Sequence, residues 1–516
     1  MKTENVSRTV LAAGVAAVIA ATALLYAPQF APGLFDDRPQ APGPAARARL
    51  AADAGAPASL PDLAALIGDR EKWLTRHPGD EASWAVLGAA YTERGVRLGD
   101  ASSYAPAERA LRRSLAVVPA ERGNVDAQLG LGALANARGD WKSARTWAER
   151  VRTANPKRWS TYPVLIDAYN GLGDYASARK AMSTLEELHT GAAVSARAAL
   201  TYRDRGWRED ASAAALDAVG LAETATEKAV GLARLGDLAW ERGEREEAVA
   251  QYGAALGLVP DHGPSLAGRA RALAALGRTD EAARDYRAAL AHRPAPEYAL
   301  EAGEFFESLG MHEDAQARYD LLRTRVWANR SDAEVALGLF EADHGDPVTA
   351  VRRLKAEWAR GHRSVRVADA LGWALYRAGE PKEALEYAKR ATDEGLRSAL
   401  FSYHRGEIER AVAEDGPARR HLAEALRINP WFSPLLAVKA QEAVAKLGEP
   451  SDEPPGELRP VTPRTEEPAR EQAAGQGQGA RQGQGTAQGE VTARGQATGQ
   501  GQTTARGQAT VPAPRA

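Results

Sequence analysis

The chain has 516 residues, a formal net charge of −2 and no cysteine. The length exceeds what one ordinary hydrophobic core supports, since single cores stop growing at about 250–300 residues, so we expect several domains or an array of repeats. The small charge predicts no general attraction to nucleic acid or to an anionic membrane. The absence of cysteine excludes disulfides, thiol catalysis and zinc–thiolate sites.

The N-terminal segment predicts export. Residues 9–26 are uncharged and nearly all apolar, and Lys2 and Arg8 precede them. About 20 apolar residues can span a bilayer, and a positive flank favours an N-terminus that stays inside. We therefore expect residues 1–27 to be a single-pass cell-membrane anchor with the body outside the cytoplasm. The alternative is a signal peptide whose cleavage gives a secreted protein, and a cytosolic protein with an apolar end is a third interpretation.

Three composition regimes follow along the chain. Residues 28–58 are rich in Pro, Ala and Gly, which predicts a linker. From about Leu60 to Leu447, apolar residues recur at spacings of three and four, which predicts an all-α body. Residues 448–516 are mainly Gln, Gly, Ala and Thr and contain TARGQAT twice. We predict that this tail is disordered, because it offers too little apolar surface to offset the entropy of ordering.

The body repeats one pattern. The segment WAVLGAAY sets Trp84, Leu87, Gly88 and Tyr91 in the spacing W-x2-L-G-x2-Y. A small residue opens each expected second helix at intervals of 33 to 37 residues, at Ala107, Ala144, Ala178, Ala211, Ala248, Ala282, Ala315, Ala350, Ala384 and Ala418. This period resembles the tetratricopeptide repeat family, whose unit is a helix-turn-helix of about 34 residues. The resemblance covers about ten copies in residues 80–447, with poor copies at Ala211 and Ala350, and implies a right-handed α-solenoid.

Several residues of the pattern have structural roles. The opening alanine lets two helices approach closely, because a larger side chain would overpack. Glycines are expected with positive φ at the ends of first helices, at Gly173, Gly243, Gly277, Gly310, Gly345 and Gly379. Asp174 and Asp346 can cap the following helix. The remaining signature residues are Tyr252, Pro260, Gly372 and Pro430. Residues 59–79 and 435–447 read as capping helices at the two ends.

No motif indicates catalysis. Neither a P-loop nor a complete H-E-x-x-H occurs, since Gln316 stands where the second histidine would be. Gly130-x-Gly132-x-x-Ala135 imitates a dinucleotide loop but lies within an expected helix. We predict that the protein is not an enzyme and has no catalytic, cofactor-binding or metal site.

The expected binding surface is the concave side, which the first helices line and which repeat proteins use for extended partners. Chaperone-binding members of the family hold a carboxylate with Lys and Asn, but the corresponding asparagine is missing here. Glu297, Glu301 and Glu304 share one helix face, which favours a basic partner or a cation. The alternative is a self-paired face in which Arg271 neutralises Glu304.

A second candidate patch is aromatic and basic. It combines Trp373, Tyr376, Arg377, Tyr403 and His404, with Arg366 near them. Aromatics with arginine are typical of interface hot spots, although Trp373 and Tyr376 can instead pack between repeats. Trp240, with Arg234 and Arg203, is a weaker version of the same patch.

These observations predict a non-enzymatic scaffold of a bacterial cell envelope. It would bind a protein partner in its concave groove, contact the membrane through its N-terminal helix, and bind no nucleic acid and no cofactor. The alternative is an extracytoplasmic protein that binds a small ligand or cell-wall glycan at the aromatic end.

Overall fold

The computed structural model describes residues 41–448, and these contain twenty-three α-helices, two short 3-10 turns and no strand. The all-α prediction is confirmed. The predicted anchor at 1–27 and the tail beyond Gly448 lie outside the described residues. Within residues 41–448, every helix is too short or too polar to span a bilayer.

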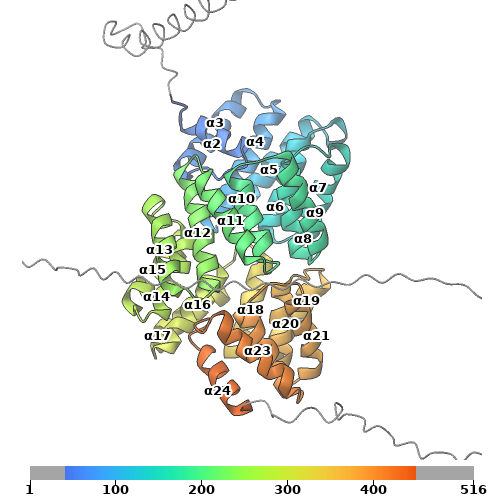
Figure 1. Cartoon of the computed structure of the whole chain (residues 1–516). Helices are drawn as coiled ribbons and strands as arrows, with labels where there is room; N and C mark the ends of the chain where they lie inside the picture. Colours follow the sequence, from blue (N-terminus) through green and yellow to red (C-terminus); the bar gives the residue numbers. More distant parts are fainter. Residues whose placement is uncertain (1–40, 449–516) are drawn as a thin grey trace, which may run out of the picture. The chain divides into compact units, whose positions relative to one another are not determined.

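Ten helix pairs follow one another along the chain (Figure 1). The first helices of the pairs are α4 (Glu81–Leu98), α6 (Val125–Arg138), α8 (Thr161–Leu172), α10 (Ala192–Arg203), α12 (Ala225–Glu241), α14 (Gly263–Ala275), α16 (Pro296–Ser308), α18 (Arg330–His344), α20 (Val365–Arg377) and α22 (Ala399–Ala411). The second helices are α5 (Tyr104–Val117), α7 (Trp141–Ala154), α9 (Tyr175–Leu188), α11 (Arg208–Gly220), α13 (Arg245–Leu258), α15 (Thr279–His292), α17 (His312–Thr324), α19 (Pro347–Ala359), α21 (Pro381–Thr392) and α23 (Asp415–Ile428).

Three helices lie outside the pairs: α2 (Pro44–Asp53), α3 (Leu60–Arg76) and α24 (Ala437–Leu447). Both α3 and α24 lie where the capping helices are expected. The linker prediction for residues 28–58 is wrong for residues 44–53, which form α2. The physical reason is that alanine-rich sequence is also the best helix former, and Pro44 suits a first helical position.

Small residues let the helices of neighbouring pairs touch. The alanines that open the second helices are almost fully buried. Tyr252 of α13 packs between Gly236 of α12 and Gly268 of α14, and a Cβ on Gly236 would lie 2.7 Å from the tyrosine ring. In WAVLGAAY, a Cβ on Gly88 would overlap Leu111. The signature residues are therefore packing residues, as their spacing predicts.

The turns between helices follow the expected rules with one exception. Asp174 and Asp346 accept hydrogen bonds from backbone amides at the starts of α9 and α19. Gly173 and Gly379 have φ of +72° and +84°. Gly345 differs, because its φ is −133°, and the prediction of a positive φ is wrong there. Its turn is instead closed by Glu341, which accepts from the amide of Asp346.

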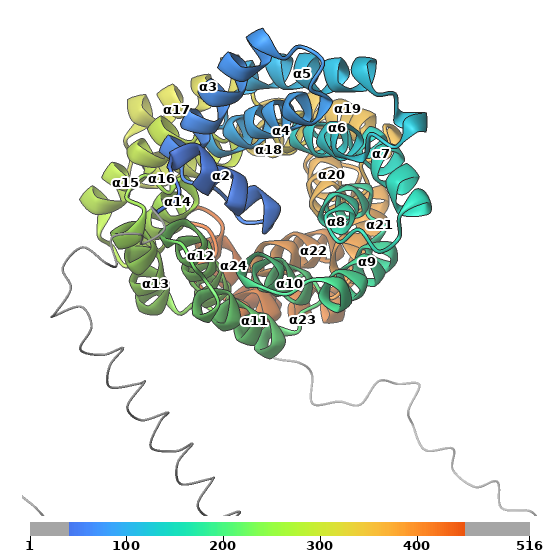
Figure 2. The ribbon, with the colours of Figure 1, turned by 90° about the horizontal axis from the view of Figure 1, so that it is seen from above.

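The ten helix pairs wind into a superhelix, and its second turn contacts its first turn. Seen from above, the first helices form an inner ring and the second helices an outer ring (Figure 2). Hydrogen bonds join positions 197, 190 and 189 residues apart: Arg293 to the carbonyl of Val96, the amide of Val365 to the Tyr175 hydroxyl, and Asn429 to the carbonyl of Trp240. With about 34 residues per repeat, one turn takes about five and a half repeats.

Glycines at the ends of first helices make this contact close. A Cβ on Gly99, Gly173 or Gly206 would overlap the carbonyl oxygen of Pro294, Arg363 or Gly395 respectively. Gly277, Gly310 and Gly379 also have positive φ, but a Cβ on them would have no neighbour within 4 Å. They belong to the second turn, so no described helix pair lies beneath them.

Candidate functional site

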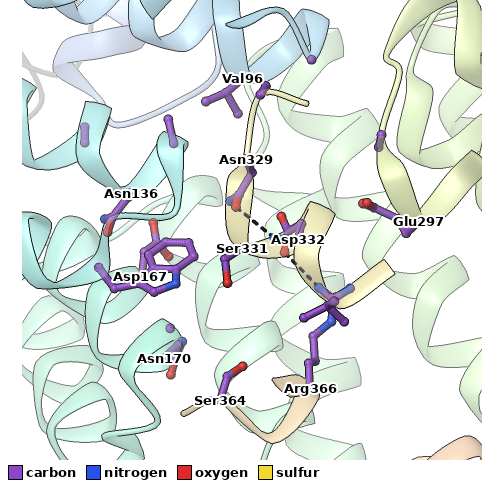
Figure 3. Close-up of a pocket in the computed structure, with 18 of the residues that line it drawn as sticks. Val96, Asn136, Asp167, Asn170, Glu297, Asn329, Ser331, Asp332, Ser364 and Arg366 are labelled. Carbon is purple, nitrogen blue, oxygen red and sulfur yellow. Dashed lines mark hydrogen bonds and ion pairs between the residues drawn. The ribbon is translucent and has the colours of Figure 1, made fainter. Parts of the chain in front are cut away.

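The inner face, defined as the surface that the first helices turn toward the superhelix axis, is hollowed between the two turns. A cavity of about 690 Å³ lies there, with the ends of α4, α6, α8 and α10 on one side and the starts of α16, α18 and α20 on the other (Figure 3). Its polar lining includes Asn136, Asp167, Asn170, Asn329, Ser331 and Ser364. An opening of this size and lining fits a polypeptide segment or a small polar ligand.

Helix capping explains two of these polar residues. Asn329 Oδ1 accepts from the amide of Asp332, 3.1 Å away, and Ser364 Oγ accepts from the amide of Val367 at 3.4 Å. Both are N-cap residues, whose side chains replace the partners that the first helical amides lack. The superhelix then brings these caps to the wall of the cavity, because the starts of second-turn helices meet the ends of first-turn helices there.

The cavity has charges of both signs. Arg366 lies 3.6 Å from Asp332, and Arg197 pairs with Asp167. Burial raises the pKa of Asp332, Arg366 opposes that shift, and Glu297 adds to it. Glu297 Oε2 is buried and has no hydrogen-bond donor among the residues of the described chain. This wall therefore favours a ligand that brings donors or positive charge to Glu297 and acceptors to Arg366.

Asn136 is a buried polar residue of the lining, with 8% of its surface exposed. Its Nδ2 donates to the carbonyl oxygen of Val164 at 2.9 Å, and its Oδ1 has no partner among residues 41–448. An unpaired buried amide oxygen costs about 1–3 kcal/mol. A donor supplied by water or by a bound chain would recover that cost.

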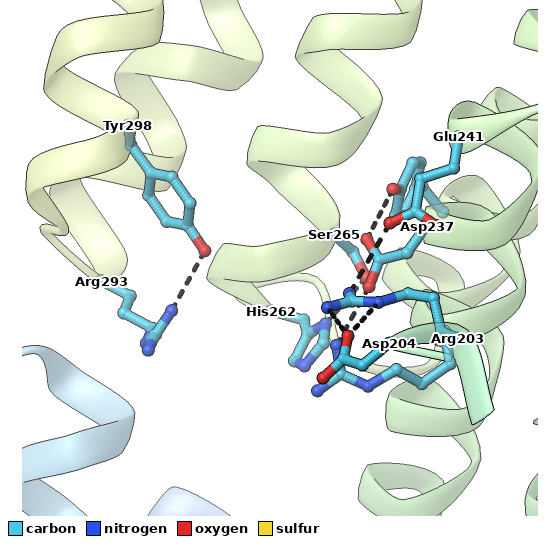
Figure 4. A network of polar contacts seen from close by, with 10 residues as sticks. Arg203, Asp204, Asp237, Glu241, His262, Ser265, Arg293 and Tyr298 are labelled. Atoms are coloured by element: carbon cyan, nitrogen blue, oxygen red, sulfur yellow. Dashed lines mark hydrogen bonds and ion pairs between the residues drawn. The ribbon is translucent and has the colours of Figure 1, made fainter. Parts of the chain in front are cut away.

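A second polar cluster lines the inner face on α10, α12 and α14 (Figure 4). The Arg203 guanidinium donates twice to Asp204, at 3.0 and 2.7 Å, and lies 3.7 Å from Glu241. Burial raises the pKa of Glu241 to about 7, and Arg203 opposes the shift. Burial likewise lowers the pKa of His262 to about 4, so this histidine is neutral at pH 7. Arg203 therefore lies between two carboxylates, Asp204 and Glu241, on this wall.

The acidic face predicted on α16 is divided among several partners. Glu301 forms a forked ion pair with Arg271 at 2.8 Å, whereas the alternative of a self-paired face placed Arg271 against Glu304. Glu304 lies 3.8 Å from His344 instead. Of the three glutamates, Glu297 lines the cavity and is left without a hydrogen-bonded partner there. In the described part of the chain, no group of His, Asp and Glu is arranged to hold a metal ion.

The aromatic patch converges, but its rings are not open to a partner. Trp373, Tyr403 and His404 are 2%, 3% and 1% exposed, and Trp373 stacks on His404 with 4.1 Å between ring centres. Trp373 Nε1 donates to Asp343, and Arg377 lies 3.6 Å from the same carboxylate. Interpreting these rings as an exposed hot spot is wrong, because they fill the space between α18, α20 and α22.

The other members of the predicted patches have different surroundings. Tyr376 is half-buried beside Trp373, with 5.1 Å between the ring centres. Trp240 is buried, and the Arg271 guanidinium covers it at 5.7 Å from the ring centre. Arg366 points into the cavity (Figure 3). The sequence predicts it beside the aromatic rings instead.

Comparison with known proteins agrees with the helix-turn-helix repeats of the fold. The fold is an α-solenoid of helix-turn-helix repeats. The model of the tetratricopeptide repeat family matches residues 92–158, 233–294, 267–329 and 370–430, so these segments are similar to tetratricopeptide repeats. No curated protein matches the sequence.

Solved structures of low similarity also align with the chain. The hetero-tetramer Cut9–Hcn1 of the APC/C has 15% identity and a TM-score of 0.39, over 72% of this chain and 76% of that one. A tetratricopeptide repeat protein from Parabacteroides merdae has 19% identity and a TM-score of 0.30, over 49% of this chain and 96% of its own. Yeast Tom70 has 12% identity and a TM-score of 0.29, over 70% of this chain and 96% of its own.

Proposed function

We propose that the protein is a non-enzymatic interaction scaffold that holds an extended segment of a protein partner on the inner face of its superhelix. The cavity between the two turns carries this proposal. It is lined by amide, hydroxyl and charged groups, among them the unpaired Glu297 carboxylate oxygen. An extended chain suits such a wall, since its amides and carbonyls recur every residue and can pair with groups of either kind.

The glycan-binding alternative has less support. It depended on exposed aromatic rings, and Trp373 and Tyr403 are buried. The experiment below distinguishes a protein partner from a small polar ligand of the cavity.

A photo-crosslinking amino acid at Asn170, inside the cavity, tests the proposal in living cells. A second one at Arg420, on the outer helix α23, is the control. We expect a covalent adduct with one partner protein at position 170 only, and we expect Arg366→Glu to reduce it at least fivefold. The matched charge reversal Arg420→Glu should leave it unchanged. Adducts of equal yield at both positions, or a small-molecule adduct at position 170, would contradict the proposal.

We also propose that residues 9–26 anchor the protein in the membrane, with the solenoid outside the cytoplasm. The support is their uncharged and nearly all apolar sequence after Lys2 and Arg8. Mass spectrometry of the mature N-terminus tests this proposal. A chain that begins at Leu24 or later excludes the anchor and favours the secreted form.

A further inference from the structure

The segment of residues 44–58 leaves the path of the repeats. If α2 and α3 continued the superhelix, α2 would join the inner ring. Instead α2 lies across the open centre of that ring (Figure 2). Residues 54–58, which we call the strap, follow α2 and contact three separate parts of the first turn: α4, the loop before α8 and the loop before α10.

The strap is held mainly through its backbone. The amide of Ala58 donates to Glu93 Oε1 at 2.9 Å, and the Arg97 guanidinium donates to the carbonyl oxygen of the same residue. The carbonyl oxygen of Ala54 lies 3.3 Å from His189 Nε2. Glu93 and Arg97 are one helical turn apart, so together they bind both the amide and the carbonyl oxygen of Ala58. Such a contact recognises the backbone of an extended chain.

The strap's side chains are small because the site leaves no room for larger ones. Gly55 has φ of +73°, and a Cβ on it would lie 2.8 Å from the ring of Trp159. Trp159 is held in place by stacking on His189, with 4.0 Å between ring centres. Ala56 and Ala58 are buried. The site therefore selects a glycine followed by small residues.

The strap meets the proposed partner site, because Glu93 also lines the cavity. Helix α2 is held by an ion pair between Arg47 and Asp62 of α3 and by few buried side chains. Ala48 is the one buried residue of α2, and Leu50 is 58% exposed. When the strap leaves, Glu93 and Arg97 can pair with each other at the i, i+4 spacing, which limits the cost of release. Burial raises the pKa of Glu93 and lowers that of Arg97, because loss of contact with water disfavours the charged form of each group.

We propose that Glu93, Arg97, Trp159 and His189 form a main-chain-binding site for an extended Gly-Ala-Pro-Ala-type segment, which the chain's own residues 55–58 occupy in competition with a partner. This inference rests on the proposed function, since it names the kind of segment that the inner face binds and what regulates its access. A tethered occupant acts at an effective concentration in the millimolar range. A partner segment therefore needs further contacts in the cavity, or several copies, to displace the strap.

A synthetic peptide with the sequence of residues 53–59, DAGAPAS, tests the site on the full chain. Saturation-transfer NMR at millimolar peptide detects binding in this affinity range. The variant Gly55→Val expels the strap, and Gly277→Val is its control, because Gly277 has φ of +74° and open space around it. We expect at least fivefold more transfer to the peptide with Gly55→Val than with the wild type or with Gly277→Val.

Two further arms check the recognition. Adding Glu93→Gln and Arg97→Gln to Gly55→Val should abolish the transfer, and so should a peptide with valine in place of its glycine. If Gly55→Val lowers helicity, Ala58→Pro replaces it, because proline removes the amide that donates to Glu93. Equal transfer with wild type and with the strap variants overturns the proposal, as does transfer that survives the change of Glu93 and Arg97.

The outcome is separable from that of the proposed function. Peptide binding without a crosslinked partner at position 170 keeps this site and removes the scaffold proposal. A crosslinked partner whose yield is unchanged by Gly55→Val, together with no peptide binding, keeps the scaffold proposal and removes this site.

Discussion

The contact between superhelical turns can be tested with one pair of glycine substitutions. Gly173 and Gly379 both end a first helix with positive φ, at +72° and +84°. Alanine costs about 1–2 kcal/mol in that backbone region at either position. At Gly173 the new Cβ also overlaps the backbone carbonyl of Arg363, whereas at Gly379 it meets nothing within 4 Å. Overpacking against a backbone typically costs a further 1–3 kcal/mol or so.

We therefore expect Gly173→Ala to lose about 1–3 kcal/mol more than Gly379→Ala in urea unfolding followed by circular dichroism. Hydrogen exchange gives the local result. The amide of Val365 donates to the Tyr175 hydroxyl at 2.8 Å across the same contact. Its exchange should quicken about tenfold for each 1.4 kcal/mol lost, in Gly173→Ala alone. Equal destabilisation by both variants, with unchanged exchange at Val365, would refute the reasoning that the two superhelical turns are in tight contact at Gly173.

Two further predictions concern buried side chains. Trp373→Ala should cost about 3–5 kcal/mol in unfolding free energy, whereas Trp431→Ala, which is 43% exposed, should cost under about 1 kcal/mol; similar losses would mean that Trp373 is not a core residue. Burial alone would raise the pKa of Glu357, but hydrogen bonds from His362 and Arg360 lower it. Glu357→Gln should therefore cost about 1–3 kcal/mol at pH 7. Because the pKa of Glu357 is lower in the folded than in the unfolded protein, the difference in stability between wild type and Glu357→Gln should shrink as pH falls below about 4. Urea unfolding of both proteins at pH 7 and pH 3.5 measures this difference. An equal difference at the two pH values would contradict the stabilising role of the Glu357 carboxylate.

The repeat signature was sufficient to predict how neighbouring helices pack. Ala248 and Ala384 are buried where they open second helices, and Tyr252 fills the gap that two glycines leave. These contacts join residues within one repeat or the next, and their spacing is visible in the sequence. Exposure was harder to predict. Trp373 and His404 come together as expected, but a helix pattern does not show whether a ring between two repeats faces the axis or the neighbouring helix.

The cavity residues were missed for a different reason. Asn329 and Ser364 have a recognisable sequence signal, since each caps a helix. Nothing in that signal indicates that their loops face Asn136 and Asn170, about 190 residues earlier, at one stretch of the inner wall. Likewise, the composition of residues 44–58 predicts a linker, and only the contacts of Ala58 with Glu93 and Arg97 indicate a bound segment.

The sequence by itself determined the repeat unit, its number of copies and the residues that let helices touch, because each repeat packs on its immediate neighbours. The pitch of the superhelix was decided only in the tertiary structure. Small rotations between successive repeats add up over about five and a half units, and their sum determines whether Gly173 meets Arg363. That sum determines where the cavity lies. It also determines the open centre of the inner ring, across which α2 lies (Figure 2).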